Sequence, residues 1–175
     1  MLKLIAIAVL TTIFVIPSSA LGQTRRRSSS RPSTSSTTAA AQRAAQVRTQ
    51  GATRVAEQIK LLTRFTYLLG GINSGIAAAD EDIRRNKATP EQVQTNQQSK
   101  ARVRSSIQTF REGLDKLEID FRATPELQPY YIKLAGSAAG AATAEEQAAG
   151  NQFDAAGRTL LNVINRLTDV LLAMR

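Results

Sequence analysis

Apolar residues recur every three or four positions in four separate stretches of the chain, and this spacing constrains the fold more than any other feature. The first two stretches run from Leu62 to Ile83 and from Val103 to Phe121. The other two run from Tyr131 to Ala141 and from Phe153 to Met174. Residues at this spacing share one side of an α-helix. The sequence therefore predicts an all-α fold, an antiparallel up-down four-helix bundle with a long first helix.

Start and stop signals predict helices at about 41–88, 90–122, 128–149 and 152–174, so that the bundle occupies residues 41–175. Thr89, Pro90 and Gln92 form a start signal, because Thr caps a helix, Pro suits its first turn and Gln can complete a capping box. Pro129 lacks a backbone N–H, which places the start of the third helix at Gln128 or Pro129. We expect this third helix to be continuous and to pack tightly on the fourth through its Ala and Gly residues.

The first 20 residues have the organisation of a secretory signal peptide. Lys3 and the amino terminus supply positive charge, residues 4–16 are mainly apolar, and Ser18 and Ala20 are small, as a signal peptidase requires. We expect cleavage after Ala20 and a secreted or periplasmic protein with no transmembrane span. The alternative is an uncleaved N-terminal membrane anchor, because the positive charge of residues 25–27 resists translocation.

Positive charge is concentrated behind this segment. The protein has a formal net charge of +9, and residues 21–54 contain seven Arg and no acidic residue. Residues 23–40 have no large apolar side chain, which predicts a disordered Ser/Thr/Arg-rich linker over residues 21–40. The absence of interleaved aromatic residues argues against specific nucleic-acid binding. Candidate residues for binding an anionic polymer of the cell envelope are Arg25, Arg26, Arg27 and Arg31.

The chain contains neither His nor Cys. This composition excludes the Glu-x-x-His metal sites of helical bundles, Ser-His-Asp and Cys-His catalysis, and disulfide bonds. Asp80, Glu81 and Asp82 are consecutive acidic residues, but consecutive residues of a helix point in different directions and cannot all reach one cation. We therefore expect no enzymatic activity, no cofactor and no metal site.

The expected helix lengths differ between the two halves of the bundle. The packed part of the first helix and the whole second helix are each about 33 residues long, whereas the third and fourth are about 22, a difference of roughly 16 Å at 1.5 Å per residue. The first two helices should therefore extend past the others around residues 78–100. We expect this polar tip either to dock a partner or to be a plain solvated hairpin. Its candidate docking residues are Asp80, Glu81, Asp82, Arg84, Arg85 and Lys87.

These features predict an exported, non-enzymatic helical bundle that acts as a structural or protein-interaction module of the cell envelope. One alternative is a polyanion-binding envelope protein that uses its Arg-rich leader. A further alternative is a carrier of a small apolar ligand in the bundle, because small residues of the third helix would leave a cavity. The sequence carries no signal for a particular partner or oligomeric state.

Overall fold

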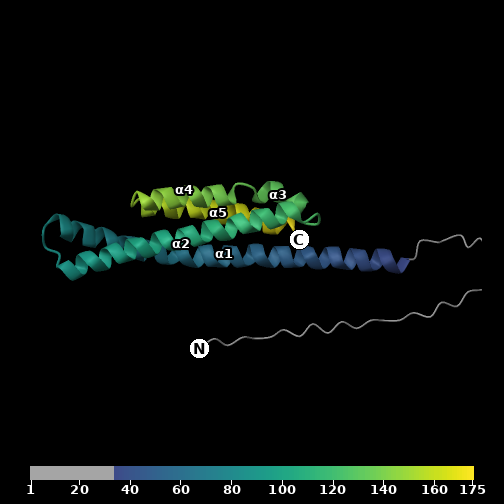
Figure 1. Cartoon of the computed structure of the whole chain (residues 1–175), viewed down its shortest axis with the longest axis horizontal. Helices are drawn as coiled ribbons and strands as arrows, with labels where there is room; N and C mark the ends of the chain where they lie inside the picture. Colours follow the sequence, from purple (N-terminus) through teal and green to yellow (C-terminus); the bar gives the residue numbers. More distant parts are fainter. Residues whose placement is uncertain (1–33) are drawn as a thin grey trace, which may run out of the picture. The chain divides into compact units, whose positions relative to one another are not determined.

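All secondary structure that the computed structural model describes, over residues 34–175, is helical (Figure 1). Side chains are described from residue 37 onward. The expected signal peptide, its cleavage site and most of the expected linker lie outside the described residues. The predicted helical bundle with a long first helix is confirmed. Its helices are α1 (Thr34–Arg84), α2 (Pro90–Ala123), α3 (Gln128–Leu134), α4 (Ser137–Ala149) and α5 (Phe153–Ala173).

The four long helices enclose one core. α1 contacts α2 and α5, and α4 contacts the same two helices, while the short α3 lies against α2 and α5. Figure 1 shows α2 returning along α1, with α3, α4 and α5 on one side of this pair. The largest fully buried side chains come from all five helices and the loop before α3, and include Leu62, Leu114, Phe121, Leu127, Leu134, Phe153, Leu160 and Leu167.

The ends of α1 and the start of α2 follow from local signals. Thr89 accepts a hydrogen bond from the backbone N–H of Gln92, and the side chain of Gln92 accepts one from the N–H of Thr89, so the predicted capping box is present. α1 begins at Thr34, ahead of the expected start near residue 41, and residues 34–40 are therefore helical. It ends at Arg84, earlier than expected, because Asn86 adopts a left-handed conformation with φ of 55°.

The prediction of one continuous third helix was wrong. Gly136 has φ of 88°, a left-handed conformation that separates α3 from α4. Arg166 of α5 donates a hydrogen bond to the carbonyl of Ala135 at 2.5 Å, and a Cβ atom at Gly136 would lie 2.7 Å from that guanidinium. Glu118 of α2 accepts from the N–H of Ala138 at 2.9 Å, which satisfies a donor at the start of α4. Side chains from two other helices therefore hold the break.

The small residues of α4 bring it close to α5. Ala141, Ala144 and Ala148 are fully buried, and a Cβ atom at Gly140 would lie only 2.8 Å from Val163. A larger residue at Gly140 would force the two helices apart. The small residues thus permit close packing at this face, as expected from the sequence.

Apolar side chains differ in burial, so their truncation to Ala should lower the free energy of unfolding by different amounts. Leu114→Ala should lower the free energy of unfolding by about 2–5 kcal/mol, because the side chain is fully buried and its loss leaves a cavity. Leu161→Ala should cost under about 1 kcal/mol, because this side chain is 49% exposed. Urea denaturation measures both. Equal, small losses would contradict a common core.

Candidate docking groove at the hairpin tip

α1 and α2 extend past the turn that joins α4 to α5. Hydrogen bonds from α1 and α2 mark the level of this turn: Asn73 donates to Asp154 at 2.7 Å, and Arg104 donates to Asn151 at 2.9 Å. Residues 74–103 lie beyond these contacts, and we call them the hairpin tip. Figure 1 shows this tip, with the α1–α2 turn at its end, projecting past α4 and α5. The overhang expected from the helix lengths is therefore present.

Polar residues occupy the buried stripe of α2 within the tip. In the bundle this stripe consists of apolar residues such as Ile107 and Leu114, whereas in the tip beyond Val103 it consists of Asn96 and Lys100, which are 4% and 8% exposed. Lys100 Nζ lies 2.6 Å from Asp80 Oδ1, and Asn96 Nδ2 donates to the same oxygen at 2.7 Å. The second amide atom, Asn96 Oδ1, is buried and has no hydrogen-bond partner in the described structure. An unpaired buried acceptor costs stability, so the tip is held together less favourably than the bundle.

The Asp80 carboxylate is stabilised in its charged form. Partial burial raises the pKa of Asp80. Hydrogen bonds from Lys100 and Asn96, together with the positive charges of Lys100 and Arg84, lower the pKa by a larger amount. The resulting pKa lies below the ordinary value of Asp. Asp80 is therefore ionised at neutral pH, and its negative charge lies beside the buried Lys100.

The structure does not gather the six predicted docking residues into one surface. Asp80 pairs with Lys100, and Glu81 pairs with both Arg84 and Arg85 on the outside of the same helix. Lys87 is exposed in the turn between α1 and α2. Of the six, Asp82 alone lines a cavity described below. Across residues 34–175 there is no cluster of three or more acidic side chains arranged to hold a metal ion.

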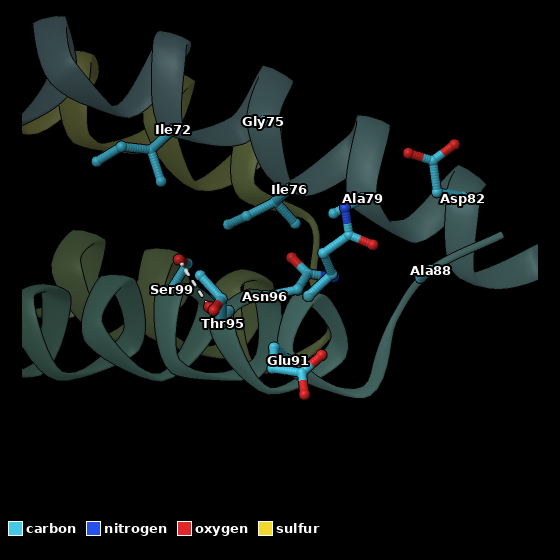
Figure 2. A pocket seen from close by; sticks show the side chains of 11 residues that line it. Ile72, Gly75, Ile76, Ala79, Asp82, Ala88, Glu91, Thr95, Asn96 and Ser99 are labelled. Atoms are coloured by element: carbon cyan, nitrogen blue, oxygen red, sulfur yellow. Dashed lines mark hydrogen bonds between the residues drawn. The ribbon is translucent and has the colours of Figure 1, made fainter.

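A half-open cavity of about 470 Å³ lies between α1 and α2 in the tip (Figure 2). Figure 2 shows Ile72, Ile76 and Asn96 between the two helices, with the yellow-green and yellow ribbons of α4 and α5 behind them. Asp82 and Glu91 lie on opposite rims, one on each helix. The other lining residues are Gly75, Ala79, Ala88, Gln92, Thr95 and Ser99.

A second cavity of about 370 Å³ adjoins the first and shares Ile72 and Ser99 with it. It is also lined by Phe65, Leu68, Arg102, Val103 and Ser106. We call the two cavities together the outer groove. It runs between α1 and α2 from the edge-on contact of Phe65 with Phe110, whose ring centroids are 5.0 Å apart, to the end of the tip.

The two walls of the outer groove differ in chemistry. The α1 wall is apolar and open to solvent, since Leu68 is 51% exposed and Ile72 is 39% exposed. Leu61, which is 52% exposed, lies two turns before Leu68 on the same face of α1. The α2 wall carries the short side chains of Ser99 and Ser106, whose hydroxyls donate to backbone carbonyls of their own helix. These serines leave the apolar wall uncovered.

Charged side chains that form no ion pair with another described side chain lie at two places along the outer groove. Asp82 and Glu91, at the tip end, form no ion pair among the described side chains, and neither does Arg102, nearer the bundle. The pKa of Glu91 is lowered by hydrogen bonds from its own backbone N–H and from Thr89, so its carboxylate is charged at neutral pH. The groove is therefore acidic at one end and basic about halfway along.

Reasoning from the sequence missed this groove although its signal is present. Phe65, Ile72 and Ala79 repeat at intervals of seven, and Leu61, Leu68 and Gly75 repeat beside them. The apolar spacing assigned Ile72 and Ala79 to the core, whereas the structure places both on the lining of the outer groove. The candidate polyanion-binding residues of the leader, Arg25 to Arg27 and Arg31, lie outside the described residues.

Comparison with known proteins found no matching protein family, curated protein or solved structure. No helix in the described part of the chain is long and apolar enough to cross a membrane.

The lowered pKa of Asp80 predicts a pH dependence of stability. A carboxyl group whose pKa is lower in the folded state contributes stability above its unfolded pKa, near 4, and loses it as the pH falls through the folded pKa. The difference in unfolding free energy between the unmodified protein and Asp80→Asn should therefore be constant above about pH 5 and shrink below about pH 4. Denaturation at stepped pH measures it. A difference independent of pH down to pH 2.5 would contradict the role given to this carboxylate.

Proposed function

We propose that the protein is a non-enzymatic helical-bundle module that binds a protein partner through the outer groove and acts, after export, in the cell envelope. The observation that carries this proposal is the apolar α1 wall at Leu68 and Ile72, which no other described helix covers. Open apolar surface with a polar rim is typical of protein interaction sites.

The division between bundle and tip supports an interaction role. The bundle is tied by apolar packing and by polar contacts between helices, such as Arg111 of α2 with Glu145 of α4 at 2.6 Å and Arg54 of α1 with Asp120 of α2. Among the described residues the tip consists of two helices, and α2 contributes the polar Asn96 and Lys100 to the seam between them. A rigid base with a less stable end is an arrangement in which a partner can order the end without unfolding the base.

In this proposal the mature protein is an antiparallel up-down four-helix bundle preceded by a basic leader. The amino-terminal sequence supports export, because residues 1–20 have the charge, apolar run and small residues of a signal peptide. The absence of His and Cys from the whole sequence supports a function that does not depend on their catalytic or metal-binding chemistry.

A site-specific crosslinking experiment tests the docking role. A photoreactive amino acid at Ile72, which lines the outer groove, should yield a discrete protein adduct in the producing cells. The same residue at Leu172, which is 52% exposed on α5, should yield none. Adducts of the same size from both positions, or from neither, would contradict a specific docking groove.

Binding of an anionic envelope polymer by the leader is the second candidate, favoured by the seven Arg and no acidic residue in residues 21–54. Removing this whole segment would not be a clean test. Gly51 lies against Leu127 and Met174, since a Cβ atom there would approach Leu127 to 2.7 Å and Met174 to 3.1 Å, and Arg54 pairs with Asp120. The segment therefore contributes to the bundle as well as to the charge.

Substitution within the leader separates the two effects. Replacing Arg25, Arg26, Arg27 and Arg31 by Ser should leave the unfolding transition unchanged, because these positions precede α1. It should also reduce the salt concentration that elutes the protein from a polyanionic resin, because four charges are lost. Elution at an unchanged salt concentration would show that the bundle itself presents the basic surface.

Transport of an apolar ligand in the bundle core has less support. The small residues of α4 that suggested a cavity are instead packed against α5, with Val163 facing Gly140. The space expected for the ligand is thus taken by a side chain at this position.

A further inference from the structure

We infer that the occupant of the outer groove is an amphipathic helix with a basic side chain at one end and an acidic side chain about eleven residues away. This inference rests on the proposed docking function and specifies the class of partner. It is carried by the length of the groove, by the spacing of its exposed apolar residues and by the positions of its unpaired charges.

The dimensions of the outer groove suit a helix. Along α1 it extends from Phe65 to Asp82, which is 17 residues and therefore about 26 Å. This length corresponds to roughly five turns of a bound helix. Both walls are themselves helices, and a third helix packs well into a groove between two others when its apolar face is turned inward.

The exposed apolar residues have the spacing that such a helix requires. Leu61, Leu68 and Ile72 lie at intervals of seven and four, so they form one line along α1. An occupant with apolar residues at i, i+3 or i+4, and i+7 would contact the part of this line that lies in the groove, at Leu68 and Ile72, and Leu61 continues the line beyond the groove. Burial of Leu68 and Ile72 removes apolar surface from water, which supplies the favourable free energy of binding.

The charges of the outer groove determine which helix fits best. Asp82 and Glu91 form the acidic end, and Arg102 follows Glu91 by eleven residues on α2, a rise of about 16 Å. A bound helix that runs along α2 would place a cation at the acidic end and a carboxylate beside Arg102 if the two are also about eleven residues apart. Residues eleven apart lie on the same side of a helix, because this spacing is close to three full turns.

Neighbouring cations do not neutralise the acidic end by direct pairing. Arg84 and Arg85 are paired with Glu81, and Lys100 is paired with Asp80. Lys87 is exposed in the turn and is not part of the lining. The two carboxylates point to opposite sides of the groove (Figure 2), so they favour a positively charged group through their combined field and not through a shared ion pair. The same field disfavours an anionic polymer at this place.

Three synthetic 18-residue amphipathic helices with the same apolar face test this inference on the full mature chain. They carry Lys at position 3 and Glu at position 14, Lys at both positions, or Glu at both. Fluorescence anisotropy at low salt should show that the protein binds the Lys/Glu peptide about 5- to 10-fold more tightly than the other two, as expected for a few exposed ion pairs.

Charge substitutions in the groove should redirect this preference. Arg102→Glu makes the groove acidic throughout and should shift the preference to the Lys/Lys peptide. The double substitution Asp82→Lys and Glu91→Lys makes it basic and should shift the preference to the Glu/Glu peptide. Matched controls are Lys116→Glu on α2 and Asp169→Lys on α5, both exposed and outside the groove lining, which should retain the preference for the Lys/Glu peptide. Circular dichroism verifies that every variant is folded.

The remaining outcomes each overturn the inference. Equal binding of the three peptides would show that the groove charges do not select the occupant, and binding of none at millimolar concentration would show that the occupant is not such a helix. Self-association in sedimentation velocity that Ile72→Asp abolishes would identify a second copy of the chain as the occupant. A crosslinked adduct at Ile72 would persist in the first two cases, which separates failure of this inference from failure of the proposed docking function.

Discussion

The unequal lengths of the helices are the constraint on which the rest of the structure depends. α1 and α2 can bury their apolar faces in a four-helix core only as far as the turn between α4 and α5, at the level of Asn73 and Arg104. Beyond this level Figure 1 shows α1 and α2 as each other's only neighbour among the described helices. A helix face without a neighbour is either polar or an exposed apolar surface. Both kinds of face are present in the hairpin tip.

The polar solution lies in the seam between α1 and α2. Lys100 and Asn96 take positions that continue the buried apolar stripe of α2, and both bond to Asp80. A partly buried ion pair contributes little net stability, because desolvation offsets most of the attraction. It does specify how the two helices align, since a shift of either helix would leave Lys100 buried without a carboxylate. The tip is consequently well aligned while it remains less stable than the bundle.

The open apolar surface lies on the other side of the same pair. Ile76 is only 4% exposed, whereas Ile72, one turn earlier, is 39% exposed and lines the outer groove. Short serine side chains on α2 leave this surface uncovered, and unpaired charges flank it. The combination of an aligned hairpin and an uncovered apolar wall is the physical basis of the docking function proposed above.

The sequence by itself determined the four apolar seams, the start of α2 at Thr89 and the overhang, because these features depend on helical periodicity, local capping and chain length. The tertiary structure decided two others. The break at Gly136 depends on Arg166 and Glu118, which come from distant helices, so local spacing did not predict it. The exposure of Ile72 depends on which helices reach that level of α1. Periodicity shows that residues share a face, but only packing shows whether another helix covers that face.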